Sequence, residues 1–337
     1  MKRMKGRGLG LLLGVLIPVA LSLAPASAQN SSIKVTGFGY VSVLPVWVAQ
    51  DRGFFAREGL EVSIDQTQGS IAQMRDMMSG KYQIAMTSID NIVAYAEGQA
   101  DITLDGFDLV GFMGVHAGLN SVVARPEIKT FADIRGKTVV VDALTTGYAF
   151  LLFRILKEHG LELNKDYSVI GIGGGGERRA MMKAGKAVAA VMSSPEDVRA
   201  KKEGYNILAD PGNALAGGYE GADYTVRKSW AKDHRKELVS MVKAMRSAHE
   251  YIYADQAGAL AILKTRIPDL SDEDARITFA SLVSGKGGLI RDAQISIQGV
   301  KTVLSIREEF ATPKKSLNDP YKYLDLSYFR EATGTDK

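Results

Sequence analysis

The sequence predicts an α/β protein that folds as two lobes. From residue 33 to residue 226, short apolar runs alternate with amphipathic ones, which is the pattern of strands alternating with helices. Beyond residue 228 the runs are mostly amphipathic with a helical period. The chain has 337 residues. A chain of this length exceeds what a single hydrophobic core usually serves, so we expect two lobes joined by more than one crossing.

The first 28 residues have the pattern of a secretory signal peptide. Four basic residues within the first seven precede an apolar run over 8–23, and Ala26, Ser27 and Ala28 provide the small residues of a cleavage site. The run is too short and too interrupted for a membrane span, which makes an uncleaved anchor the weaker interpretation. We therefore expect cleavage after Ala28 and a periplasmic mature protein. No Cys follows the run, so no lipid attachment site is expected.

Charge and cysteine content exclude several classes of protein. The signal segment holds four of the 42 basic residues and none of the 38 acidic ones, which leaves a mature chain with 38 of each. A neutral chain without a basic run gives no electrostatic case for nucleic acid or an anionic membrane surface as a partner. The absence of Cys excludes disulfides, thiolate zinc sites and a cysteine nucleophile.

Turn and capping residues divide the chain into elements. Pro45 begins the first expected helix, Gly69 and Ser70 begin the second, and Gly80 and Gly160 follow helix ends. The expected strands are 33–38, 60–64, 82–87, 107–115, 121–124, 138–141, 167–172, 187–192, 206–208 and 223–226. The expected helices are 44–57, 70–78, 89–99, a short one with a turn at 131–137, 146–159, 177–184, 195–202, 229–252, 255–266, 271–283, 295–310 and 326–331.

The Gly-rich segment 171–176 satisfies the pattern G-x-G-x-x-G after an expected strand and before an expected helix. Glu196 lies at the distance of a ribose-binding acid, so the segment resembles a dinucleotide fingerprint. Three facts weaken that interpretation: the motif is halfway along the chain, the helix after it is short, and the chain is exported to a space without free nicotinamide cofactor. We expect no cofactor. Whether the segment, with Gly175, faces a ligand or is a plain turn stays open.

Residues that would activate a nucleophile are sparse. The histidines lack zinc-ligand spacing, so no metal site is expected. His159, His234 and His249 fall on helical surface patterns and are expected to be solvated, whereas His116 ends an apolar run and either faces a cleft or caps the run. Ser229 to Lys232 matches S-x-x-K without its partner motifs, and chance explains it better. The sequence therefore does not favour an enzyme.

Small hydroxyl and Gly residues follow five of the expected strands, each cluster directly before a helix. Helix capping explains any one of them. Together they indicate a binding site, because ligands of α/β sheets bind outside the carboxyl ends of strands and helix N-termini there suit an anion. The clusters are Tyr40-Val41-Ser42, Gly69-Ser70, Thr87-Ser88, Thr145-Thr146-Gly147-Tyr148 and Ser193-Ser194.

Four segments resemble a known family. Residues 49–62 match A-x-x-x-G-[FY]-F-x-x-x-G-L-x-V, and 129–140 contain an element similar to D-L-[KR]-G-K. Residues 78–88 and 325–329 are similar to the family's third-strand segment and its C-terminal D-x-S-[FY] helix. The chain resembles periplasmic solute-binding proteins of the nitrate/sulfonate/taurine and thiamine-precursor (NMT1/THI5-like) group. It departs at Gln83 and Val188, where the family often has Asp.

The resemblance implies the two-lobe type II periplasmic binding protein fold, with a ligand cleft between the lobes. It implies one lobe at 30–117 plus 222–337, the other at 118–221, and hinge strands at 115–121 and 218–225. The five clusters, with His116, Gly175 and Glu196, would face a small-molecule ligand, and Tyr40 and Tyr148 would be aromatic walls of the cleft. The implied partner is an ABC transporter permease, and we expect a monomer.

The implied function is capture of a small anionic organic solute, a carboxylate or sulfonate, and its delivery to an ABC importer without turnover. Helix N-termini without an obvious buried Arg or Lys favour an anion or a neutral polar molecule. Three alternatives stay open. The first is an exported NAD-dependent oxidoreductase that uses the 171–176 loop. The second is thiamine-pyrimidine synthesis, against which the signal peptide argues, and the third is a ligand sensor with the same fold.

Overall fold

The computed structural model describes Met1 and residues 30–38, 41–209, 215, 218–285 and 287–335. In this part of the chain, two five-stranded mixed sheets are flanked by helices. The predicted α/β fold with two lobes is therefore confirmed. We call the part that carries the first sheet lobe I and the part that carries the second sheet lobe II. The expected signal peptide lies outside the described residues, apart from Met1.

The sheet of lobe I combines strands from both ends of the chain. Its order is β2 (Leu60–Gln66), β1 (Ser31–Gly37), β3 (Ile84–Thr87), β10 (Ala222–Arg227) and β4 (Leu109–His116). β1 runs parallel to β2 and β3, whereas β10 runs antiparallel to β3 and β4. Because β10 enters from lobe II, lobe I is complete only after the chain has returned.

The sheet of lobe II repeats this plan. Its order is β7 (Ser168–Gly171), β6 (Thr138–Val141), β8 (Ala189–Ser193), β5 (Asn120–Ala124) and β9 (Asn206–Ala209). β6 runs parallel to β7 and β8, and β5 runs antiparallel to β8 and β9. In lobe I the strand that runs antiparallel to β3 is β10, and the chain reaches it from lobe II. In lobe II the strand that runs antiparallel to β8 is β5, and the chain reaches it from lobe I. Two chain crossings therefore connect the lobes.

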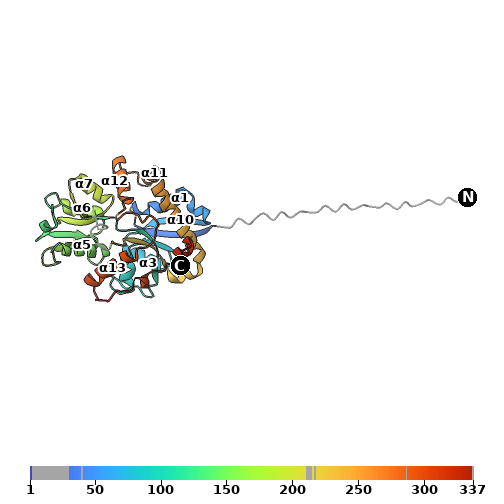
Figure 1. Ribbon diagram of the computed structural model, residues 1–337, viewed down its shortest axis with the longest axis horizontal. Helices are drawn as coiled ribbons and strands as arrows, with labels where there is room; N and C mark the ends of the chain where they lie inside the picture. Colours follow the sequence, from blue (N-terminus) through green and yellow to red (C-terminus); the bar gives the residue numbers. More distant parts are fainter. Residues whose placement is uncertain (2–29, 39–40, 210–214, 216–217, 286, 336–337) are drawn as a thin grey trace.

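Helices cover both sheets, and the last third of the chain is helical as expected. Figure 1 shows α5, α6 and α7 at one end of the molecule and α1 and α10 at the other. Before the return crossing the helices are η1 (Val41–Val43), α1 (Leu44–Asp51), α2 (Phe54–Arg57), α3 (Ser70–Met78), α4 (Ile89–Ala96), η2 (Phe131–Ile134), α5 (Gly147–Glu158), α6 (Gly175–Lys183) and α7 (Glu196–Lys202). After it come α9 (Lys228–Asp233), α10 (Arg235–Ala254), α11 (Gln256–Arg266), α12 (Asp272–Leu282), α13 (Ile297–Phe310), η3 (Pro320–Tyr323) and α14 (Ser327–Thr333).

Two expected helices are each divided in two. Gly53 separates α1 from α2 at a φ of 68°. Glycine adopts this left-handed conformation without steric strain because it has no Cβ. His234 separates α9 from α10 at a φ of −126°, and its Nδ1 lies 2.8 Å from the carbonyl oxygen of Trp230. The apolar period continues across both breaks, which is why the sequence pattern predicted single helices.

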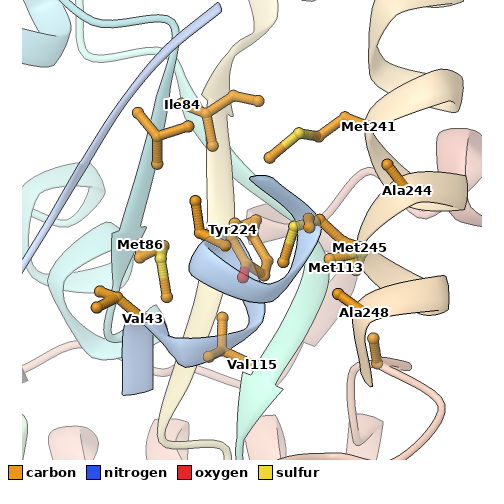
Figure 2. Close-up of a cluster of buried hydrophobic side chains, with 14 of the residues drawn as sticks. Val43, Ile84, Met86, Met113, Val115, Tyr224, Met241, Ala244, Met245 and Ala248 are labelled. Carbon is orange, nitrogen blue, oxygen red and sulfur yellow. The ribbon is translucent and has the colours of Figure 1, made fainter. Parts of the chain in front are cut away.

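The core of lobe I lies between its sheet and α10 (Figure 2). The α10 side chains that face the sheet recur at the spacing of one helical face, and they are fully or almost fully buried. Small alanines alternate with methionines along this face, so the helix packs closely against the strands. The side chains are Ile84, Met86, Met113, Val115 and Tyr224 of the sheet and Met241, Ala244, Met245 and Ala248 of α10.

The expectation that His249 is solvated is wrong. This α10 residue is fully buried, and its Nδ1 lies 2.7 Å from the carbonyl oxygen of Ile290. Burial lowers the pKa of His249 to about 4. The segment around Ile290 covers a second side of α10, which a helical pattern taken alone does not reveal.

A buried ion pair connects α13 to α4 and to lobe II. The Arg307 guanidinium donates from Nε to Asp90 Oδ1 at 2.6 Å and from Nη2 to Asp90 Oδ2 at 2.6 Å. Nη2 also donates to the Thr145 carbonyl oxygen at 3.0 Å. The two charged side chains are 0% and 2% exposed. One guanidinium therefore contacts both lobes.

We predict that Asp90→Ala lowers the free energy of unfolding by about 3–5 kcal/mol, because it leaves the Arg307 charge buried without a counter-charge. The matched control is Glu162→Ala, since the Glu162–Lys165 pair is 59% and 72% exposed, and its loss should cost under about 1 kcal/mol. Urea denaturation of both variants measures the difference. Equal, small losses would contradict the importance of the buried pair.

Candidate functional site

A cavity of about 730 Å³ lies between the lobes. Lobe I contributes the carboxyl end of β3 and the starts of α3 and α4. Lobe II contributes the carboxyl end of β8 and the starts of α5 and α6. This is the edge at which open α/β sheets bind ligands. The two sheets therefore present their ligand-binding edges to one shared space.

The structure brings together most of the residues that the sequence analysis selected. Those that line the cavity come from six separate stretches of sequence and from both lobes. They are Val41, Ser42, Gly69, Ser70, Thr87, Ser88, His116, Thr146, Gly147, Tyr148, Ser193 and Ser194.

The other four selected residues do not join this set. Tyr40 lies outside the described residues. Thr145 is turned to lobe I, where its hydroxyl donates to Asp101 Oδ1 at 2.6 Å. The Glu196 carboxylate forms salt bridges with Arg179 and with Arg199 of its own helix. Gly175 packs against Glu196, because a Cβ on it would lie 2.9 Å from Glu196 Cγ.

Four helices begin at the cavity. The Ser88 hydroxyl accepts from Asp90 N at 3.2 Å at the start of α4, and the Thr146 hydroxyl accepts from Ala149 N at 3.2 Å at the start of α5. Glycines 69 and 174 precede α3 and α6. First-turn N–H groups have no acceptor within their own helix, and the helix dipole is positive there. The cavity wall is therefore rich in N–H donors.

The Thr and Ser hydroxyls that lobe II places at the cavity are already bonded to acceptors of the same lobe. Each donates at 2.7–2.8 Å, so its hydrogen is not available to a ligand. The bonds run from Thr146 to Asp142, from Ser193 to Asn120 and from Ser194 to Asp197.

Four charged side chains that the sequence analysis did not select also line the cavity: Arg75 and Asp101 of lobe I, and Asp142 and Arg178 of lobe II. Arg178 is 7% exposed and donates from Nε to the Val191 carbonyl oxygen at 3.0 Å and from Nη1 to the Gly173 carbonyl oxygen. Burial raises the pKa of Asp142, and the nearby Arg178 charge opposes this rise. The expectation of a site without a buried Arg is therefore wrong.

Part of the Gly-rich segment 171–176 reaches the cavity. Gly173 and Gly174 line it, and Gly174 N donates to Glu177 Oε2 at 2.7 Å. A Cβ on Gly173 would lie 2.4 Å from the same oxygen. The loop is thus packed against its own helix, and its glycines allow that close approach.

His116 lies where the chain leaves β4 for lobe II. It lines the cavity, and its Nδ1 accepts from Gly118 N at 3.2 Å and from Leu119 N at 3.4 Å. Burial lowers the pKa of His116 to about 4. A neutral ring with its proton on Nε2 is therefore the form that these bonds require.

Some of the missed residues carried a sequence signal and others did not. Asp142 directly follows the strand Thr138–Val141, so the strand-end rule extended to charged residues would have found it. Asn91 and Arg178 are the third and fourth residues of their helices, and only the cavity geometry identifies them. Among the described residues, no three His, Asp or Glu side chains are grouped as a metal site. No helix among them has the length and apolar character of a membrane span.

A family model and a known protein each match much of the chain. The family model described as NMT1/THI5 like matches residues 41–259, more than half of the chain. YtlA of Bacillus subtilis (strain 168), which is named only as a binding protein, is 20% identical over 242 residues, 71% of each chain.

Solved structures show the same fold at low sequence identity. The periplasmic nitrate-binding protein NrtA from Synechocystis PCC 6803 is 14% identical with a TM-score of 0.74, over 92% of this chain and 90% of NrtA. The alkanesulfonate-binding protein SsuA from Xanthomonas axonopodis pv. citri, solved with MOPS, is 16% identical with a TM-score of 0.68, over 87% of this chain and 96% of SsuA.

The buried histidines contribute a loss of stability on acidification, which is opposed by the buried carboxyl groups of Asp223 and Glu220, whose pKa values burial raises. The pKa of His116 is about 4 in the folded chain against an ordinary value of 6.5. The unfolded chain therefore binds the proton first, and this contribution to stability, about 3 kcal/mol, is lost as the pH falls from 6.5 to 4. His249 has the same shift and adds a similar loss.

We expect His116→Asn to remove the His116 share of this loss, about 3 kcal/mol relative to the wild type, because the Asn carbonyl oxygen can replace Nδ1 as the acceptor for Gly118 N. The measurement is the urea unfolding free energy between pH 7 and pH 4.5. The control is His159→Asn, at an exposed residue, which should keep the wild-type slope. A slope that His116→Asn leaves unchanged would contradict the role given to this ring.

Proposed function

Because the chain belongs to the NMT1/THI5-like family, we propose that it captures a small organic solute between its lobes and delivers it unchanged to an ABC importer. The observation that carries this proposal is the cavity into which both sheets direct their strand ends and four helices their N-termini. A solute there touches both lobes at once. The Staphylococcus aureus ligand-binding component of an ABC-type import system shares the fold with a TM-score of 0.72, which is consistent with the proposal.

We propose a carboxylate or sulfonate as the solute's head group. Helix N-termini favour anions, and Arg178 adds a positive charge at the cavity wall. The cavity-lining hydroxyl and Gly residues would contact the solute, and Tyr148 would be an aromatic wall of the cleft. Thr145, Gly175 and Glu196 would act by supporting neighbouring residues, because they do not line the cavity.

Closure of the lobes over the solute is the proposed mechanism. Residues 30–117 with 222–337 would move as one body and 118–221 as the other, about hinges at 115–121 and 218–225. The breaks between β4 and β5 and before β10 fall in these hinges, which supports the division. A solute that touches both lobes only when they are closed shifts the population to the closed state. The closed surface would then bind the permease.

Binding without chemical turnover fits the way the cavity groups are used. Two of the cavity hydroxyls, Thr146 and Ser194, donate to carboxylates, not to a base that would activate them. Use of the 171–176 loop for NAD would need Glu196 at a ribose, whereas Arg179 binds its carboxylate. The proposed setting is the periplasm, with the signal peptide cleaved after Ala28 and the mature chain acting as a monomer.

We predict that the chain purified from the periplasm carries one solute per molecule, which mass spectrometry of the released small molecules will identify. Calorimetric titration with that compound should saturate at a 1:1 ratio, and the compound should be recovered unchanged after prolonged incubation. Recovery of a chemically altered product would contradict binding without turnover.

We further predict that Arg178→Met weakens binding of this solute about 10- to 100-fold, the effect of losing a charge-assisted hydrogen bond. Arg179→Met is the matched control on the same helix, because Arg179 pairs with Glu196 and Glu203 and does not line the cavity. It should leave the dissociation constant within about twofold of the wild-type value. Equal losses in both variants would contradict the role of Arg178.

A further inference from the structure

The Asn91 side chain lies between the N-terminal ends of α3 and α4. Its Nδ2 donates to Thr87 Oγ1 at 2.9 Å and to Ser70 Oγ at 3.4 Å. Thr87 is the last residue of β3, and Ser70 is the first residue of α3. All three residues line the cavity. One amide group therefore connects two hydroxyls that face the same space.

This arrangement fixes the direction of both hydrogen bonds. An amide NH₂ group has two N–H bonds and donates only, so both hydroxyl oxygens must accept from it. Each hydroxyl then still has its own hydrogen to donate. Among the described residues, no acceptor is found for the hydrogen of Ser70 or Thr87. Thr87 lines the cavity but is only 1% exposed, so its hydroxyl is almost completely buried at the cavity wall.

The opposite wall of the cavity differs in this respect. The hydroxyls of Thr146, Ser193 and Ser194 already donate to acceptors of lobe II. On the lobe I side, the Ser88 hydroxyl accepts from Asp90 N, which leaves its hydrogen free as well. Free hydroxyl donors are therefore concentrated on lobe I.

We propose that Asn91 is a specificity-determining positioning residue, which holds Ser70 and Thr87 as a pair of donors for a head group that only accepts hydrogen bonds. A carboxylate or sulfonate satisfies both donors. An ammonium or other donor-only group leaves them unpaired, and a buried unpaired donor strongly disfavours binding. This inference rests on the proposed function and adds which lobe selects the head group and how.

A double-mutant cycle with butane-1-sulfonate as the probe tests this mechanism by calorimetry. Asn91→Ala and Thr87→Val should each weaken binding about tenfold, because each removes one part of the same donor arrangement. The double variant should be no more than about twofold weaker than the worse single variant, since Asn91 acts through Thr87. Asn318→Ala and Thr302→Val, at residues that do not line the cavity, are the matched controls and should bind as the wild type does.

A second variant reverses the direction of the bonds and also adds a negative charge beside the head group. The carboxylate of Asn91→Asp accepts, so both hydroxyls would donate to it and present lone pairs to the cavity. This variant should lose butane-1-sulfonate binding at least 100-fold and gain binding of butylammonium. A variant that only disturbs the fold would bind both probes less, and the thermal midpoint from circular dichroism reports folding separately.

The outcomes separate this inference from the function beneath it. Wild-type binding of butane-1-sulfonate with additive losses in the cycle would overturn the role of Asn91 and leave the proposed function intact. A wild-type preference for butylammonium over butane-1-sulfonate would overturn both the donor arrangement and the anionic ligand class. Wild-type binding with strong coupling in the cycle supports the inference.

Discussion

One buried guanidinium determines how the two halves of the site meet. Arg307 binds the Asp90 carboxylate through two nitrogens and the Thr145 carbonyl oxygen through one of them. Asp90 lies in the first turn of α4, and Thr145 lies just before α5. These helices begin at the cavity, one from each lobe. Close packing continues at Gly147, where a Cβ would lie 2.5 Å from Asp90 Cγ. Burying an ion pair contributes little net stability, so its value here is in geometry: it sets the distance between the donor-rich ends of α4 and α5.

Most of the fold could be predicted from the sequence because its signals are local. Apolar runs bounded by Gly or Pro gave the strands, and amphipathic runs that end before Gly80 or Gly160 gave helices. The predictions that were wrong concern features that depend on contacts between distant segments. Gly53 and His234 divide helices whose apolar period does not stop. His249 has the pattern of a surface residue until the segment at Ile290 covers it.

The same distinction applies to the candidate site. Small residues at strand ends could be selected because the carboxyl edge of an α/β sheet is a general binding location. The direction of the hydrogen bonds that these residues make could not be predicted from the sequence. Ser70 and Ser194 both follow expected strands in the sequence. The Ser70 hydroxyl accepts from Asn91 and keeps its own hydrogen to donate, whereas the Ser194 hydroxyl donates its hydrogen to Asp197. Arg178 reaches the cavity from the fourth position of a helix, and the Gly173 and Val191 carbonyls hold it there. Such differences arise only when separate segments come together.

The two lobes therefore have different tasks in the proposed capture of a solute. Lobe I offers free hydroxyl and helix N-terminal donors, and lobe II adds Arg178 and an aromatic wall at Tyr148. The most direct test of this account is a crystal structure of the periplasmic protein with its own solute bound. The account predicts one unaltered solute in the cavity, with its acidic group on Ser70 and Thr87 and with Arg178 of the other lobe in contact. A solute bound to one lobe alone, outside the cavity, or in chemically altered form would contradict it.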